Sequence, residues 1–330
     1  MKLIYKQMIV ALMMGFVFPW MILGIVSSFA SREESLSATS ASETDTFTRP
    51  EVSDVPDMIL RVVTQDSIES MALEEYVAGV VLVEMPADFE PEALKAQAVV
   101  ARTYALRRKE QGKKHETGDV CTDPNCCQGY RSPEEYIARG GRGEAVEKIR
   151  AAVDATAGQV LTYKGDLIEA TYFSCSGGQT EDALAVWGAD IPYLQSTLSP
   201  GEEKAAHYSD TVIMTLEEFR SCMDSTLPAD PNAWFGAVTY TEGGGVETIR
   251  IGDETYKGTE VRSLLALRST DFTIRYTGRA IEIVTHGFGH RVGMSQYGAD
   301  AMAVSGSTYT QILAHYYQGT MVQDYNRLGN

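Results

Sequence analysis

The feature that most limits how this chain can fold is an uncharged apolar run near its start. Lys2 and Lys6 precede the stretch from Met8 to Ala30, which carries no charged side chain. Roughly 20 apolar residues cross a bilayer core as a helix, whereas signal-peptide cores run only about 7–15 residues. We therefore expect residues 1–30 to be an uncleaved, single-pass membrane anchor, with a cleavable signal peptide ending near Ser28-Phe29-Ala30 as the alternative. The lysines on the inner side would leave the rest of the chain outside the cytoplasm.

The segment that follows the apolar run is not expected to fold. Residues 31–56 read "SREESLSATSASETDTFTRPEVSDVP", rich in Ser, Thr and acidic residues and poor in large apolar ones. Such a composition is typical of a solvated linker. The folded region is therefore predicted to be 57–330, long enough for one large domain or two moderate ones.

The order of periodic segments in this region predicts the fold class. Helical patterns dominate its first half, and hairpin patterns dominate the second half. This is an α+β order of mixed helices and antiparallel hairpins, since a parallel α/β sheet would need regular alternation. We expect a single elongated catalytic region, of one or two subdomains, with a substrate groove. The predicted helices are 70–86, 91–109, 144–156 and 215–223, and the predicted hairpins are 159–173, one around 242–245, and 272–285.

The charge of the chain bears on the class of partner. Lys and Arg number 28 against 45 Asp and Glu, a formal net charge of −17. Phosphate backbones require a basic face, so a nucleic-acid partner is excluded. A neutral or weakly charged polymer fits this balance better.

One carboxylate stands in an unusual place. Along the helix of residues 70–86, an apolar stripe that begins at Tyr76 ends at Glu84, and Pro86 stops the helix directly afterwards. Apolar neighbours and the negative end of the helix dipole both disfavour a charge there, so the pKa of Glu84 should be raised, as suits a general acid. The alternative is a surface glutamate paired with Lys95 or Arg102.

The helix that follows carries two polar residues among alanines. Gln97 and Arg102 lie within "PEALKAQAVVARTYALRRK". We expect both to border a substrate groove, with an ordinary solvated cation as the alternative for Arg102.

A cluster of cysteines occupies "HETGDVCTDPNCCQGY", which holds three of the five cysteines of the chain. His115, Cys121, Cys126 and Cys127 together supply the four ligands of a closed, structural Zn²⁺ site. A disulfide is the alternative outside the cytoplasm, although an odd cysteine count would leave a thiol unpaired. Adjacent Cys126 and Cys127 make the fourth ligand the weakest assignment. The site would hold a loop that forms one wall of the groove near Glu84.

Three motifs together resemble one family. They are "EEYVAGVVLVEMPADFEPEALKAQAVVARTYAL", "YFSCSGGQTEDALAVWGADIPYL" and "GFGHRVGMSQYGADAMA", in that order from about residue 57 to the C-terminus. The chain resembles the stage II sporulation protein D (SpoIID) family of membrane-anchored peptidoglycan lytic transglycosylases. The resemblance implies that Glu84, in Glu84-Met85-Pro86-Ala87, is the catalytic acid. It further implies cleavage of the β-1,4 bond from N-acetylmuramic acid to N-acetylglucosamine, with 1,6-anhydro ends as products.

The resemblance also implies substrate contacts, location and partners. The substrate is expected to be peptide-free glycan strands, cut during forespore engulfment at the mother-cell membrane. Expected partners are the sporulation amidase SpoIIP and the membrane protein SpoIIM. One departure is Arg291, which stands where the family usually has a small residue. The predicted substrate-binding residues are Gln97, Arg102, Tyr172, Ser174, Ser176, His290, Ser295 and Gln296.

Two alternatives of other classes remain open on the sequence. Cys175, before Ser-Gly-Gly, could be the nucleophile of a Cys–His peptidase, although a small packed residue is the simpler interpretation. The domain could also be a glycan-binding module that enhances an amidase without cutting glycan, against which the intact Glu84-Met85-Pro86-Ala87 motif stands.

Overall fold

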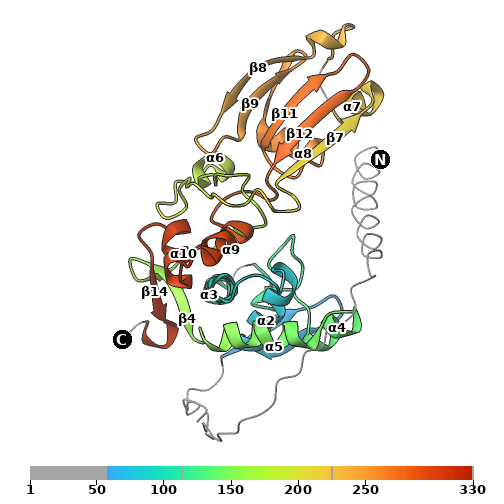
Figure 1. Ribbon diagram of the computed structural model, residues 1–330. Coiled ribbons are helices and arrows are strands. Elements are labelled where there is room, and N and C mark those ends of the chain that lie inside the picture. The colour runs from blue at the N-terminus through green and yellow to red at the C-terminus, as the bar shows by residue number, and fades with distance from the viewer. Residues whose placement is uncertain (1–57, 113, 224–225, 329–330) are drawn as a thin grey trace, which may run out of the picture. The chain divides into compact units, whose positions relative to one another are not determined.

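The computed structural model describes residues 58–112, 114–223 and 226–328 (Figure 1). The predicted anchor and linker lie outside these residues. Within the described part of the chain, no helix combines the length and apolar character needed to cross a membrane. The α+β prediction is confirmed, because helices and several small, largely antiparallel sheets make up the fold.

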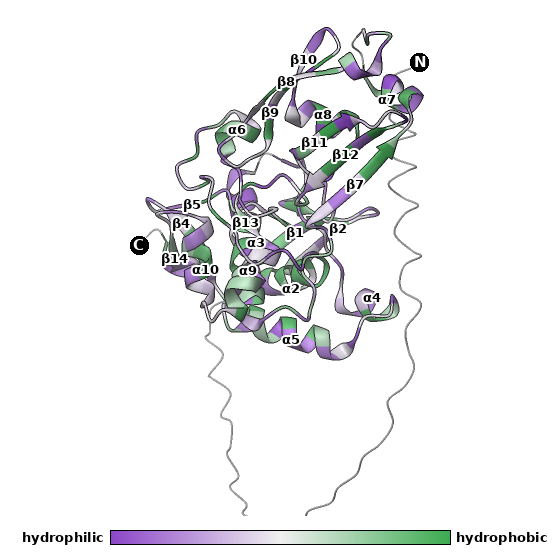
Figure 2. Cartoon of the chain, turned by 45° about the horizontal axis from the view of Figure 1, so that its top comes forward, coloured by the Kyte–Doolittle hydropathy of each residue, from purple (hydrophilic) through white to green (hydrophobic). Residues whose placement is uncertain are grey.

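The first hydrophobic core is built around a helix that is buried on nearly all sides. Alanines at 93, 96, 98, 101 and 105 are all inaccessible to solvent and let neighbouring helices approach α3 closely. Figure 2 shows alternating apolar and polar bands on α5, whose buried residues include Ile149 and Val153. The helices of this region are α2 (Leu73–Glu84), α3 (Pro91–Gln111), α4 (Pro133–Ala138), α5 (Gly143–Asp154), α6 (Ala183–Trp187), α9 (Gln296–Val304) and α10 (Tyr309–Tyr316).

Three small sheets accompany these helices. The sheet β2-β1-β3 joins an antiparallel pair to a parallel one, and β14-β4-β5 is antiparallel throughout. The parallel pair of β6 and β13 joins the second sequence motif to the third. Their strands are β1 (Ile59–Val63), β2 (Ile68–Ala72), β3 (Val120–Cys121), β4 (Gln159–Tyr163), β5 (Asp166–Leu167), β6 (Tyr172–Phe173), β13 (Met294–Ser295) and β14 (Met321–Asp324).

A second hydrophobic core is formed by two antiparallel sheets of three strands each, in the orders β10-β9-β8 and β11-β12-β7. Trp234 and Phe219 are fully buried in it and stack at 5.7 Å between ring centroids. The elements are β7 (Ser209–Met214), β8 (Phe235–Tyr240), β9 (Val246–Ile251), β10 (Glu254–Lys257), β11 (Asp271–Tyr276), β12 (Ile281–His286), α7 (Leu216–Cys222) and α8 (Gly258–Leu264), with a 3-10 turn at Pro231–Ala233. A second 3-10 turn, Tyr325–Arg327, follows β14 and packs against the first core.

The predicted elements agree with the structure apart from two boundaries. Helix α2 begins at Leu73, because residues 70–72 belong to β2 and pair with β1. The hairpin of residues 159–173 ends early, since β6 leaves it to pair with β13. Its turn has positive φ at Lys164 and Gly165, as a tight two-residue hairpin requires.

Candidate functional site

Glu84 lies at the end of α2, where the helix meets its stop signal. Met85 takes an extended conformation ahead of Pro86, so α2 ends at Glu84. The carboxyl group therefore belongs to the last residue of the helix. Burial raises the pKa of the Glu84 carboxyl, as the sequence predicted, although hydrogen bonds from Gly129 and Tyr172 partly oppose this shift. The alternative prediction, a surface glutamate paired with Lys95 or Arg102, does not hold. Lys95 pairs with Glu92 at 2.6 Å, and Arg102 pairs with Glu74.

Two groups from distant segments hold this carboxyl. The backbone N–H of Gly129 donates to Glu84 Oε1 at 2.9 Å. The Tyr172 hydroxyl also hydrogen-bonds to the carboxyl group, and it accepts a bond of 3.2 Å from Gln128 Nε2. The Gln128 carbonyl oxygen in turn accepts from the Tyr76 hydroxyl at 3.5 Å. The result is a chain of hydrogen bonds that fixes Glu84 from one side.

Both phenols in this chain stay protonated at ordinary pH. Burial is the largest cause of the raised pKa of Tyr172, and the nearby Glu84 carboxylate adds to it. Burial likewise raises the pKa of Tyr76. The site therefore presents neutral hydrogen-bonding groups around a single carboxyl group, and the groups that shift the pKa of Glu84 include no second carboxylate.

The segment that carries Gln128 and Gly129 packs closely against α2 at Gly79. A Cβ at Gly79 would lie 2.2 Å from the Tyr130 ring and 2.8 Å from the carbonyl oxygen of Arg131. The absence of a side chain at Gly79 lets the loop approach, and Tyr130 stacks on Tyr76 at 5.7 Å between centroids. The Arg131 N–H also donates to the Gly79 carbonyl at 3.2 Å.

The predicted metal ligands come together directly before this segment. The side-chain donor atoms of His115, Cys121, Cys126 and Cys127 all lie within 4.8 Å of one another. His115 Nε2 is 3.2 Å from Cys127 Sγ and 3.9 Å from Cys126 Sγ. Tetrahedral zinc, with bonds of about 2.0–2.3 Å, would separate its ligand atoms by roughly 3.5–3.8 Å. The cluster therefore fits a metal ion, and its cysteines form no disulfide in the structure.

A turn lets the thiols of the adjacent residues Cys126 and Cys127 lie in the same cluster. The N–H groups of Cys126 and Cys127 both donate to the Asp123 carbonyl, at 3.0 and 2.8 Å. This compact turn brings both thiols into the cluster. Cys121 is fixed separately on β3, which pairs with β1. The cluster thus joins a strand at one end to the Gln128–Gly129 segment at the other.

Gln97 and Arg102 lie in the interior. Both side chains have no solvent exposure. Arg102 donates to both carboxylate oxygens of Glu74, at 2.9 and 2.5 Å, and to the carbonyl of Gln159 at 3.1 Å. The side-chain amide of Gln97 finds no hydrogen-bond partner among the described residues. Neither side chain faces a groove surface in this structure.

The remaining predicted residues divide between the Glu84 site and the interior. Tyr172 contacts Glu84, and the ring of His290 lies beside Phe173, the neighbour of Tyr172, at 5.6 Å between centroids. Ser295 caps α9 and bonds the carbonyl of Ser174 at 3.4 Å. Ser176, Ser295 and Gln296 are all buried, whereas Ser174 is half-buried.

Sequence reasoning missed Gly129, which donates to Glu84 from the loop, and Gln128, which bonds Tyr172 beside it. The only available signal was their position directly after the predicted metal ligands. It also missed Glu202, whose Oε2 accepts bonds from Ser176 Oγ at 2.9 Å and Cys175 Sγ at 3.1 Å.

The environment of Cys175 does not support a nucleophilic thiol. Its side chain is fully buried, and burial together with the Glu202 carboxylate raises the pKa of the thiol to about 12. A nucleophilic cysteine requires a lowered pKa and a nearby base. The thiol donates to a carboxylate instead, so Cys175 packs as a structural residue.

The comparisons with known proteins define the class of this chain. Residues 63–163, which include α2, α3 and the His/Cys cluster, match the family model SpoIID, stage II sporulation protein. The chain is 39% identical to stage II sporulation protein D of Bacillus subtilis over 313 residues, covering 91% of this chain and 90% of the relative. It is 41% identical to the protein of that name from Bacillus amyloliquefaciens, covering 78% of this chain and 76% of the relative. The chain belongs to the stage II sporulation protein D family.

A more distant relative carries a different name. The chain is 28% identical to a Bacillus subtilis protein named amidase enhancer, over 75% of this chain and 40% of the relative. The likeness therefore extends to a relative that is named for an effect on an amidase.

Proposed function

We propose that the chain is a peptidoglycan lytic transglycosylase that acts on glycan strands during sporulation, with Glu84 as its single catalytic acid. The observation that carries this proposal is the Glu84 carboxyl group, whose pKa is raised by burial and which accepts a 2.9 Å bond from the Gly129 N–H. Membership of the stage II sporulation protein D family supports the sporulation role.

The chemistry suits a site with one carboxyl group. Protonated Glu84 donates its proton to the oxygen of the β-1,4 bond as the bond from the muramic acid anomeric carbon to that oxygen breaks. The 6-hydroxyl of the same muramic acid forms a new bond to this carbon, and its proton passes to the Glu84 carboxylate. The products are a 1,6-anhydro end and a free 4-hydroxyl end, with no water consumed. Because the nucleophile is intramolecular, its effective concentration is high and a second carboxylate is not required.

The Gly129 N–H and the Tyr172 hydroxyl fix the carboxyl group in one orientation. Since both bonds persist when Glu84 loses its proton, they stabilise the carboxylate form that must take the 6-hydroxyl proton. Burial disfavours the carboxylate and so keeps part of Glu84 protonated. Because burial and these hydrogen bonds act in opposite directions on its pKa, Glu84 can first donate a proton and then accept one.

We propose that the His/Cys cluster binds structural Zn²⁺ through His115, Cys121, Cys126 and Cys127. The cluster offers four protein ligands and leaves no open position for water, so the ion would stabilise the loop rather than take part in the reaction. Its effect would reach Glu84 through Gln128 and Gly129, which follow Cys127 in the chain.

We also propose that the folded region acts outside the cytoplasm, held at the membrane by residues 1–30, with SpoIIP and SpoIIM as partners. The apolar run and its preceding lysines support this location. The partners rest on the family resemblance.

The test is mass spectrometry of products from peptide-free glycan strands, incubated with a soluble chain that starts near Ser31 or with its Glu84→Gln variant. The proposal expects 1,6-anhydro ends from the native protein and none from the variant. The second candidate function is an amidase-enhancing, glycan-binding module, favoured by the relative named amidase enhancer. If both proteins bind strands and neither cuts them, this second function replaces the first.

A further inference from the structure

The side-chain amide of Gln128 is buried between two tyrosine hydroxyls. Its Nε2 donates to the Tyr172 hydroxyl at 3.2 Å, and its Oε1 accepts from the Tyr76 hydroxyl at 3.5 Å. Only 1% of the residue is exposed to solvent. A buried amide must satisfy its donor and its acceptor with neighbouring protein atoms, so these two bonds determine which way the amide is turned.

The orientation of this amide follows from the chemistry of the groups beside it. The Glu84 carboxylate can only accept hydrogen bonds, so the Tyr172 hydroxyl that bonds to it must donate. A phenol has a single proton to donate. Since Tyr172 directs that proton to Glu84, it can only accept from Gln128, which places the NH2 group of the amide on this side. All these hydrogen bonds therefore run toward Glu84, starting at the Tyr76 hydroxyl.

The opposite orientation would direct the proton of the acid into the protein. With the amide turned over, Gln128 Oε1 would accept the Tyr172 proton, and Tyr172 could then only accept from Glu84. Protonated Glu84 would donate to the phenol, where its proton cannot reach a glycosidic oxygen. In the observed orientation the Gly129 N–H and the Tyr172 hydroxyl are both donors to Glu84. The proton of the acid form is thus left for an acceptor outside this chain of hydrogen bonds.

We infer that Gln128 is a positioning residue, which holds Tyr172 as a hydrogen-bond donor to Glu84 and so directs the Glu84 proton toward the substrate. The inference rests on the proposed function for the reaction that uses this proton. Gln128 acts through Tyr172, and its own amide transfers no proton. Its donation also polarises the Tyr172 O–H group, which strengthens the bond from that group to the Glu84 carboxylate.

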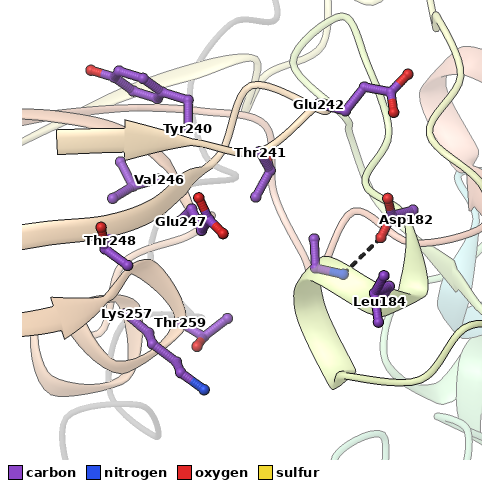
Figure 3. Close-up of a pocket in the computed structure, with 11 residues that line it drawn as sticks. Asp182, Leu184, Tyr240, Thr241, Glu242, Val246, Glu247, Thr248, Lys257 and Thr259 are labelled. Carbon is purple, nitrogen blue, oxygen red and sulfur yellow. Dashed lines mark hydrogen bonds between the residues drawn. The ribbon is translucent and has the colours of Figure 1, made fainter.

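The experiment is a double-mutant cycle on the full chain, with Gln128→Met and Tyr172→Phe made separately and together. Methionine has nearly the volume of glutamine and no N–H group, so Gln128→Met removes the donor with little change in packing. Gln111→Met, at an exposed glutamine of α3, is the matched control. Tyr240→Phe is the control for the tyrosine, because Tyr240 is 58% exposed and lines a separate pocket between α6 and strands β8 and β9 (Figure 3).

Two measurements are made on each variant. The first is the initial rate at which 1,6-anhydro ends are released. The second is a ¹³C NMR titration of the glutamate side-chain carboxyl groups, in which the Glu84 signal is identified by its absence from Glu84→Gln. The titration requires no cleavage, so it tests the contact of Tyr172 with Glu84 independently of the proposed reaction.

Gln128→Met is expected to slow cleavage about tenfold, as the loss of one hydrogen bond in the site would do. It should also move the midpoint of the Glu84 titration to higher pH, because the carboxylate loses part of the donation that stabilises it. Tyr172→Phe should change both quantities in the same directions and at least as far. In the Tyr172→Phe background, Gln128→Met should change neither quantity further, and both controls should match the native protein.

The outcomes distinguish this inference from the proposed function. A native midpoint in Gln128→Met, or additive shifts in the double variant, overturns the role of Gln128 even if the native protein produces 1,6-anhydro ends. A midpoint that rises in each single variant and no further in the double variant supports this role, even if the native protein cuts nothing and the transglycosylase proposal fails. Circular dichroism checks that each variant is folded, and Gln128→Leu, which also lacks the donor, repeats the cycle if Gln128→Met unfolds.

Discussion

The backbone amide of Gly129 donates a 2.9 Å hydrogen bond to Glu84 Oε1, across 45 positions of sequence. The bond connects the end of α2 to the segment that follows the His/Cys cluster. A half-buried carboxyl group that is held by a fixed donor is restricted in its orientation. The position of the acid therefore depends on a loop that supplies no catalytic side chain of its own.

Gly129→Ala is expected to reduce glycan cleavage by about 10- to 100-fold. A Cβ at this position would lie 3.0 Å from Glu84 Oε1 and 3.0 Å from Val83 Cγ1, so the carboxyl group must move. The release of 1,6-anhydro ends over time measures the effect. Gly143→Ala is the matched control, because a Cβ there meets nothing within 4 Å. Equal rates for Gly129→Ala and the native protein would contradict the role of this contact.

Much of the Glu84 environment could be predicted from the sequence, because the apolar stripe and Pro86 are local signals. The Gly129 contact could not, since no local pattern reports a hydrogen bond made between segments. The burial of Arg102 could not be predicted from the sequence for a related reason. Its place among alanines predicts a packed helix, but only the structure shows that α3 is covered on the side of Glu74 as well. The pairing of β6 with β13 was also hidden, because strands of two residues have no readable periodicity.

The raised pKa of Glu84 should be visible in the pH dependence of stability. Because its pKa is raised by burial, the folded chain binds more protons than the unfolded chain between the ordinary and the raised pKa. The contribution of Glu84 to stability is therefore complete below the ordinary pKa of about 4.3 and is lost as pH rises through the raised value. Glu84→Gln lacks this loss, so its Tm should exceed that of the native protein near neutral pH, and the difference should vanish toward about pH 4.

Cleavage by the native protein should decline over the same rise in pH, since the general acid must be protonated. Thermal unfolding of both proteins across this pH range, beside the exposed control Glu254→Gln, makes the measurement. A Tm difference that does not change with pH would show that Glu84 is not perturbed.

Removal of the proposed metal should damage both stability and cleavage. The ligand atoms of His115 and the three cysteines come within 4.8 Å only in the folded chain, so metal binding is coupled to folding. Dialysis against a chelator, with thiols kept reduced, is expected to lower the Tm and the cleavage rate, and added Zn²⁺ should restore both. Cys127→Ser should behave like the chelated protein, whereas Cys222→Ser, on α7, should not. Elemental analysis that finds no metal in fully stable, active protein would exclude this site.

Arg102→Ala should act through stability. The guanidinium is fully buried and binds both carboxylate oxygens of Glu74, so its removal strands a carboxylate and several backbone carbonyls. Loss of one partner of such a pair costs about 3 kcal/mol in unfolding free energy, which urea titration measures. Arg275→Ala, from an ion pair whose arginine is 72% exposed, should cost less than about 1 kcal/mol. An Arg102→Ala protein of native stability with slower cleavage would instead place Arg102 at the glycan.

Cys175 should remain unreactive in the folded protein. Its thiol is fully buried, donates to Glu202 Oε2 at 3.1 Å, and has a pKa raised to about 12 by burial and by that carboxylate. Because the thiolate is the reactive form, iodoacetamide near neutral pH should leave Cys175 unmodified, and peptide mapping should find the label there only after unfolding in urea. Cys175→Ala should still produce 1,6-anhydro ends, since the thiol takes no part in the proposed reaction. Rapid labelling of the folded chain at Cys175, with loss of activity in step, would return the cysteine peptidase to consideration.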